Sequence, residues 1–161
     1  MSDQQRSIDN LQTALGMELT AIHQYLLHAH VLEDWGLDRL ASRMRSEMQE
    51  ELGHAGKFVD RILYLGGDPK VSEAKTPKKA QSLPSLFADD LREERGSIGF
   101  YTDAAAAARA DGDIGTAVLF EKVVLDEEEH ADWLDRQIGL IERMGEGVYM
   151  GRQMSDPSAT E

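Results

Sequence analysis

Residues 50–67, EELGHAGKFVDRILYLGG, and residues 125–145, LDEEEHADWLDRQIGLIERMG, carry the clearest signal of the fold. In both stretches apolar residues recur at steps of three and four, which is the period of an amphipathic helix. Both also place a glutamate, and a histidine three residues later, in line with the apolar positions. Because residues three apart share a helix face, these polar pairs should point into the core. The pairs are Glu51 with His54 and Glu127 with His130.

The same helical period extends over most of the chain and predicts an all-α fold. Short gaps containing Gly36 and Gly112 separate the first segment from the second and the third from the fourth, with Asp38 and Asp113 available as N-caps. Short gaps produce antiparallel helical hairpins. The four segments run over about Ser7–Glu33, Asp38–Leu65, Pro84–Arg109 and Ile114–Met144.

The connection between the two hairpins, residues 66–83, is long and rich in proline. At ~3.3 Å per residue it can span ~55 Å, whereas a helix of about 28 residues is only ~42 Å long. It can therefore cross the whole bundle and make the second and third helices parallel. The alternative, a flexible linker between separate hairpins, is disfavoured because a lone hairpin could not bury its apolar stripe. A short fifth helix is expected around Val148–Met154, followed by a disordered Ser/Pro/Thr end.

Length and composition restrict the classes of protein. A chain of 161 residues predicts one domain over residues 1–161, with the bundle at about 7–144. The absence of cysteine excludes disulfides, thiolate metal sites and iron–sulfur clusters. A net charge of −13 disfavours nucleic acid as a partner and favours cations. The start MSDQQRSIDN resembles no export signal and no run is apolar enough to span a membrane, so we expect neither export nor membrane insertion.

The two hairpins superimpose with a constant offset of 76 residues and without a gap. The offset matches apolar positions, as any bundle would, but it also matches polar ones. Glu18 and Glu94 each occupy a core position of their helix, like the glutamate and histidine of each pair. The matched polar residues are Glu18 with Glu94, Glu51 with Glu127, His54 with His130, and Tyr25 with Tyr101.

Four inward carboxylates without compensating charge would cost several kcal/mol each. The only nearby base is Arg95, which flanks Glu94, so we expect cations in the core. Two divalent ions cancel four carboxylates. The six residues divide into Glu18 with His54 on one ion and Glu94 with His130 on the other, with Glu51 and Glu127 bridging. Carboxylate and imidazole ligands suit iron or manganese, and zinc would also bind. The alternative is that both Glu-x-x-His pairs lie on the surface.

These residues resemble those of the ferritin-like di-iron proteins, and more closely the bacterioferritins. The similarity covers essentially the whole chain, and its motifs are ELTAIHQYLLHA at 18–29, DLREERG at 90–96 and the two opening stretches. It implies a ferritin-like four-helix bundle with a long crossover. It also implies a non-haem di-iron centre whose metal ligands and catalytic residues are Glu18, Glu51, His54, Glu94, Glu127 and His130.

The resemblance also implies a function. Bacterioferritins are cytoplasmic iron-storage and detoxification proteins that assemble 24 subunits into a hollow shell. They oxidise Fe²⁺ with O₂ or H₂O₂ and keep the ferric mineral inside. Tyr25 matches the family's redox-active tyrosine, and Trp133 matches an aromatic residue near the site. No such role is carried over for Tyr101, for which packing in the core is expected.

The chain departs from the family at the haem position. Bacterioferritins bind haem b between two subunits through a methionine at the position where this chain has Leu52. Met48, one turn earlier, is an alternative thioether ligand, although a methionine there is typically a packing residue. The resemblance otherwise implies a homo-oligomer without bis-methionine haem, or a mixed shell whose second subunit type supplies the methionine. Ser46 and Glu50 also replace a histidine and an aspartate that line an inner-surface iron site in some relatives.

The sequence leaves three other functions open. A rubrerythrin-like di-iron peroxidase usually carries a four-cysteine domain, and this chain has no cysteine. A non-catalytic shell subunit of a mixed bacterioferritin would lose ferroxidase ligands and keep the haem methionine, the reverse of what is found. A mini-ferritin that protects DNA would place its ligands between subunits and often has a basic arm, whereas this N-terminal arm has only Arg6.

Overall fold

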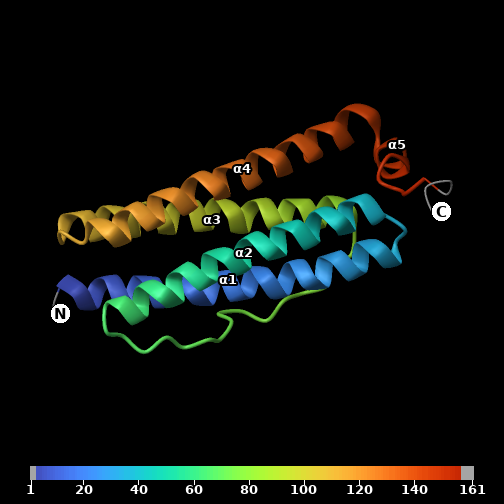
Figure 1. Ribbon diagram of the computed structural model, residues 1–161. Coiled ribbons are helices and arrows are strands. Elements are labelled where there is room, and N and C mark those ends of the chain that lie inside the picture. The colour runs from blue at the N-terminus through green and yellow to red at the C-terminus, as the bar shows by residue number, and fades with distance from the viewer. Residues whose placement is uncertain (1–2, 157–161) are drawn as a thin grey trace.

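The structure, a computed structural model, describes residues 3–156 and consists of two helical hairpins side by side (Figure 1). The described part contains helices and no strand, so the predicted all-α class is confirmed. None of its helices is long and apolar enough to span a membrane. The helices are α1 (Asp3–Asp34), α2 (Asp38–Tyr64), α3 (Leu83–Ala110), α4 (Ile114–Met144) and α5 (Glu146–Gly151).

Both hairpin turns use a glycine in the left-handed region, Gly36 at φ 80° and Gly112 at φ 77°, as the short gaps predict. Asp113 caps α4 by accepting a hydrogen bond from the Thr116 amide. The corresponding prediction for Asp38 is wrong. Leu37 is the N-cap of α2 and no side chain caps it, while Asp38 lies inside the first turn, where its charge still complements the helix dipole.

The crossover runs along α1 and enters α3 from the opposite end of the bundle, so α2 and α3 point the same way (Figure 1). Side chains of α1 fix its path. Gln12 exchanges two hydrogen bonds with the backbone of Lys70, and the Thr20 hydroxyl accepts from the Ala74 and Lys75 amides. Gln24 likewise exchanges two bonds with Lys78. The crossover is therefore an irregular segment held against α1 by hydrogen bonds, rather than a loose linker.

The fifth helix is present but begins earlier than the predicted Val148–Met154. Gly145, at φ 82°, ends α4 and turns the chain directly into α5. Tyr149 is then buried, and its hydroxyl donates to Gln137 of α4 at 2.7 Å. The chain continues to the start of α2, where the Arg39 amide donates to the Gln153 carbonyl. Ser155, at the start of the Ser/Pro/Thr end that is expected to be disordered, donates a hydrogen bond to Asp38, and the rest of that end, residues 157–161, lies outside the described residues.

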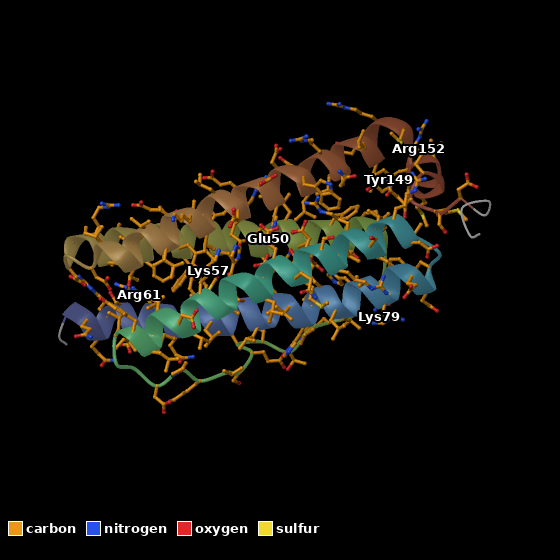
Figure 2. The ribbon with its side chains drawn as sticks, in the orientation of Figure 1. Glu50, Lys57, Arg61, Lys79, Tyr149 and Arg152 are labelled. Carbon is orange, nitrogen blue, oxygen red and sulfur yellow. The ribbon has the colours of Figure 1, made fainter. Side chains whose placement is uncertain are left out.

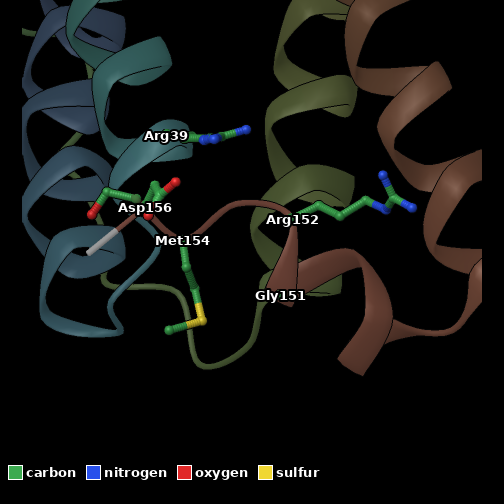
Figure 3. A pocket seen from close by; sticks show the side chains of 6 residues that line it. Arg39, Gly151, Arg152, Met154 and Asp156 are labelled. Atoms are coloured by element: carbon green, nitrogen blue, oxygen red, sulfur yellow. The ribbon is translucent and has the colours of Figure 1, made fainter. Parts of the chain in front are cut away.

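A pocket of about 410 Å³ lies where this returning segment meets α2 (Figure 3). Arg39, Arg152 and Met154 line it together with three small or acidic residues. The side chains of Arg152, Met154 and Asp156 are partly or fully exposed. This pocket therefore lies on the surface at one end of the bundle.

The core divides into two apolar clusters along the bundle. One contains Leu32, Leu40, Met44 and Phe87, and the other contains Leu11 and a group of aromatic rings. In every long helix the buried residues of the two clusters are 10 or 11 positions apart, which is about three turns. The positions between them hold the six predicted ligand residues, so a polar layer lies between two apolar ones.

Candidate metal centre

The six predicted ligand residues meet in this polar layer. Glu18 comes from α1, Glu94 from α3, and the two Glu-x-x-His pairs from α2 and α4. None of the six is more than 5% exposed. They form two groups in which one ligand atom from each residue lies within 4.8 Å of the others, and both groups include Glu51 and Glu127. The groups are Glu18, Glu51, His54 and Glu127, and Glu51, Glu94, Glu127 and His130. We call these six residues the centre.

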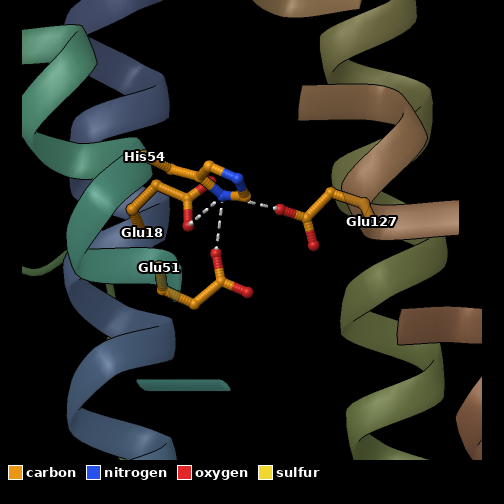
Figure 4. Close-up of side chains that lie close together, drawn as sticks. All are labelled: Glu18, Glu51, His54 and Glu127. Atoms are coloured by element: carbon orange, nitrogen blue, oxygen red, sulfur yellow. Dashed lines mark hydrogen bonds and ion pairs between the residues drawn. The ribbon is translucent and has the colours of Figure 1, made fainter. Parts of the chain in front are cut away.

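In the first group the ring nitrogen Nδ1 of His54 faces three carboxylates (Figure 4). It lies 3.0 Å from Glu51 Oε2, 3.3 Å from Glu127 Oε1 and 3.9 Å from Glu18 Oε2. These oxygens come from three different helices. The arrangement therefore needs both hairpins, and a single hairpin could not form it.

The second group repeats the first with His130 in place of His54. His130 Nδ1 lies 3.2 Å from Glu51 Oε1, 3.6 Å from Glu127 Oε2 and 3.8 Å from Glu94 Oε1. Glu51 and Glu127 thus turn one oxygen toward each histidine. That is the arrangement a bridging carboxylate needs.

The outward nitrogens of both histidines contact acidic side chains that are not among the predicted site residues. His54 Nε2 lies 2.9 Å from Asp126 Oδ2, and His130 Nε2 lies 3.0 Å from Glu50 Oε2. Figure 2 labels Glu50 on α2. A carboxylate at Nε2 favours the proton there, which leaves Nδ1 free as a ligand. The sequence repeat does contain an indication of these residues, because Glu50 and Asp126 are also related by the offset of 76.

Glu47 breaks this symmetry. Its Oε2 lies 2.6 Å from His130 Nε2, whereas the position of the repeat that corresponds to it holds Val123. His130 therefore has two acidic partners on its outer side and His54 has one. The repeat therefore gives no indication of Glu47. The other oxygen of Glu47, Oε1, lies 2.5 Å from Arg43 Nε.

Both repeated tyrosines hydrogen-bond to the centre. Tyr25 donates to Glu94 Oε1 at 2.5 Å, as expected for a residue near the site. Tyr101 donates to Glu18 Oε1, so the expectation that it only packs in the core is wrong. Trp133 packs edge-on against Phe87 and under the Arg43 guanidinium.

Burial and mutual repulsion shift the pKa values of the centre strongly. Burial, with the neighbouring charges of Glu51 and Glu127, raises the pKa of Glu18 well above its usual value, and burial has the same effect on Glu94. Burial alone would lower the pKa of His54, but the facing carboxylates outweigh it and raise that pKa to about 10. Without cations, protons must compensate the negative charge.

The centre retains buried polar atoms without hydrogen-bond partners among the described residues. They are Glu51 Oε1, Glu94 Oε2, Glu127 Oε1 and His130 Nδ1. Unpartnered buried oxygens and nitrogens are costly in a core unless something else binds them. Arg95 does not do so, because it is 63% exposed and lies 3.6 Å from Asp135. Oxygen and imidazole donors converging in this way fit two divalent cations.

A cavity of about 720 Å³ joins the centre to the outer surface between α1, α3 and the crossover. Its inner wall includes Glu18, Glu94 and both tyrosines, and its outer rim includes the exposed Lys75. The crossover thus covers the centre without sealing it. Small ions and molecules can reach the carboxylates by this route.

Comparison with known proteins agrees with this geometry. A family model described as the ferritin-like domain matches residues 8–144. Bacterioferritin BfrA of Mycobacterium tuberculosis is 37% identical over 147 residues, which cover 91% of this chain and 92% of the relative. Bacterioferritin of Rhodobacter capsulatus is 37% identical over 145 residues, 90% of each chain. The chain belongs to the bacterioferritin family.

Solved structures of bacterioferritins have the same fold. The structure of Mycobacterium tuberculosis BfrA matches with a TM-score of 0.91 at 36% identity, covering 94% of this chain and 95% of that one. A Rhodobacter capsulatus bacterioferritin matches with a TM-score of 0.93 at 35% identity, covering 97% and 98%. That structure is described as having a metal-free dinuclear site and a haem iron in a crystallographic special position.

The haem position of bacterioferritins is occupied here by an exposed apolar residue. Leu52 is 53% exposed on α2, and a leucine side chain has no atom that can ligate iron. Met48 is partly buried and packs against the cluster that contains Leu32 and Leu40, and Met44 is fully buried. The residues present therefore do not fit haem held by a methionine from each of two subunits.

Proposed function

We propose that this chain stores iron as a ferroxidase, binding two Fe²⁺ ions as substrate at the centre, oxidising them and passing ferric iron to the interior of a 24-subunit shell. The observation that supports this proposal most directly is the pair of overlapping four-residue groups that share Glu51 and Glu127. Membership of the bacterioferritin family supports iron storage as the broader function. The localisation proposed with it is cytoplasmic.

In this proposal Glu18 and His54 Nδ1 hold one ion, Glu94 and His130 Nδ1 hold the other, and Glu51 and Glu127 bind both. The two ions together supply two electrons, the number that reduces O₂ to H₂O₂ or H₂O₂ to water. The donors are oxygen and imidazole nitrogen without thiolate, which suits iron.

In this proposal the neighbouring acidic residues and the bound protons also affect how the centre binds cations. Asp126 and Glu50 keep the proton of each histidine on Nε2, so that Nδ1 faces the cluster. Protons carried by Glu18, Glu94 and the histidines must leave when cations enter, so binding releases protons. The net charge of −13 attracts Fe²⁺ toward the protein.

The haem position leads us to propose a shell without bis-methionine haem in the homo-oligomer, or a mixed shell in which a second subunit type supplies the methionine. Protein refolded with haem b is expected to show no Soret band. A Soret band that disappears in Met48→Ala would instead assign the haem to Met48.

Rapid mixing of Fe²⁺ with O₂ or H₂O₂ tests the ferroxidase proposal. Glu18→Ala, and His54→Ala combined with His130→Ala, are expected to lower the initial rate of Fe²⁺ oxidation by at least tenfold, because each removes ligands. His30→Ala is the matched control, since His30 lies on α1 with its side chain 65% exposed. Unchanged rates in both ligand variants would refute the assignment.

A further inference from the structure

At the centre, two tyrosine hydroxyls form hydrogen bonds between α1 and α3. Tyr25 of α1 donates to Glu94 of α3, and Tyr101 of α3 donates to Glu18 of α1. The offset of 76 that relates the two tyrosines also relates the two glutamates. Each terminal carboxylate of the centre is therefore held by the hairpin to which it does not belong.

Tyr101 is held in place by aromatic packing. It is fully buried, and its ring stacks on Phe120 at 5.8 Å between centroids with an interplanar angle of 18°. Phe58 packs against it at 5.8 Å and Phe100 at 5.7 Å, both at steeper angles. These rings come from α2, α3 and α4. The position of the Tyr101 hydroxyl is consequently fixed by three helices before any ligand binds.

The two carboxylate oxygens of Glu18 have different partners. Oε1 accepts the hydrogen bond of the Tyr101 hydroxyl, whereas Oε2 is the oxygen that faces His54 Nδ1 at 3.9 Å. Glu94 is arranged differently. Its Oε1 both accepts from Tyr25 and lies 3.8 Å from His130 Nδ1, and its Oε2 has no hydrogen-bond partner. Only Glu18 has one oxygen committed to the tyrosine and the other to the cluster.

We propose that Tyr101 is a positioning residue that restricts Glu18 to a single ligating oxygen, Oε2, and so sets the affinity and coordination number of the cation shared with His54. This inference rests on the proposed dinuclear centre. Residues that orient metal ligands typically alter metal affinity by about 10- to 100-fold when they are replaced. Without the hydroxyl, Glu18 can turn both oxygens to the cation.

Titration with Co²⁺ alone tests this without turnover, because the visible absorption of Co²⁺ reports its coordination number. In Tyr101→Phe, which keeps the ring, we expect one of two binding steps to weaken about tenfold and its absorption bands to change. The other step is expected to stay as in the unaltered chain. Tyr25→Phe is expected to change the other step.

Tyr149→Phe is the matched control. Tyr149 is as buried as Tyr101, but its hydroxyl donates to Gln137 and touches no residue of the centre. If the unaltered chain binds two Co²⁺ ions and Tyr101→Phe binds them with the same affinities and spectrum, the role of Tyr101 is refuted while the centre stands. If the unaltered chain binds no pair of Co²⁺ ions, the proposed function itself fails.

A measurement on protein that keeps Tyr101 covers the case in which Tyr101→Phe does not fold. Ultraviolet resonance Raman spectra distinguish a tyrosine that donates a strong hydrogen bond from one that does not, and the chain has only four tyrosines. Addition of Zn²⁺ is expected to leave the donor signature of Tyr25→Phe protein unchanged, because Tyr101 keeps its bond to Glu18. Loss of that signature on Zn²⁺ binding would overturn the proposal.

Discussion

Asp126 is the residue on which the orientation of His54 depends. It is partly exposed and lies 2.9 Å from His54 Nε2, on the side of the ring away from the centre. The six centre residues could be predicted because they occupy core positions and repeat at a fixed offset. Asp126 and Glu50 also share that offset, but they lie beside the apolar stripe, where acidic residues are ordinarily solvated. Glu47 is buried in line with Met44 and Glu51, but it has no acidic counterpart in the repeat. Their role follows only from the direction of the histidine rings.

Replacing Asp126 with alanine is expected to weaken Zn²⁺ binding at the centre about tenfold, because the proton and orientation of His54 are no longer fixed. Isothermal titration calorimetry of the assembled protein measures this. Asp132→Ala is the control, as Asp132 is exposed on α4 and pairs with Arg136 in the same helix. Equal affinities in the Asp126 variant and the control would contradict the role given to Asp126.

The start of α4 shows how local chemistry and long-range contacts combine in an element. Asp113 caps the helix through Thr116 and also accepts a hydrogen bond from Arg61 of α2 at 2.5 Å, which joins the two hairpins. The cap could be predicted from sequence because it depends on neighbouring residues. The Arg61 contact could not, since it joins positions far apart in the chain. For the same reason α5 was misplaced, because Tyr149 positions it by burial against α4.

Asp113→Ala is expected to lower the free energy of unfolding by about 1–2 kcal/mol at neutral pH, through loss of the cap and the ion pair. Burial raises the pKa of Asp113, but hydrogen bonds from Thr116 and Arg61 outweigh it, so the pKa is lowered in the folded chain. The stabilisation is therefore present above an unfolded-state pKa of ~3.9 and disappears as pH falls through the folded value.

Urea unfolding of both proteins at several pH values measures this difference. Asp103→Ala, an exposed position on α3, serves as the control. A difference between Asp113→Ala and the unaltered chain that stays constant down to strongly acidic pH would contradict the role of the ionised cap.

At the scale of the whole molecule, the proposed function depends on net charge and on assembly. The sequence pattern predicted the bundle and the parallel α2 and α3 correctly, because periodicity and the crossover length leave few topologies. It did not predict the cavity, which depends on how the crossover lies over α1 and α3. The number of subunits remains a proposal, and size-exclusion chromatography is expected to give a particle of 24 chains rather than one or two.

Electrostatic attraction predicts that salt slows iron capture. Raising ionic strength from ~0.01 M to ~0.15 M shortens the Debye length from ~30 Å to ~8 Å, which screens the net charge of −13. The initial second-order rate of Fe²⁺ oxidation in stopped-flow experiments is expected to fall several-fold. A rate that does not depend on salt would show that the acidic surface has no part in capture.

Assembly also provides a test at Leu52. Because Leu52 is exposed on α2, Leu52→Met presents a thioether on the face where bacterioferritins bind haem between two subunits. The variant refolded with haem b is expected to gain a Soret band that the unaltered chain lacks. Leu63→Met, also exposed on α2, is the control. No gain at Leu52→Met would mean that this face does not pair as it does in haem-binding relatives.

The most direct test of the centre is a crystal of the protein soaked in Fe²⁺ without oxygen and measured at the iron absorption edge. Two anomalous peaks are expected within each chain, one beside Glu18 and His54 and one beside Glu94 and His130, with Glu51 and Glu127 between them. Iron bound only elsewhere, with these six side chains still paired to one another, would contradict the account.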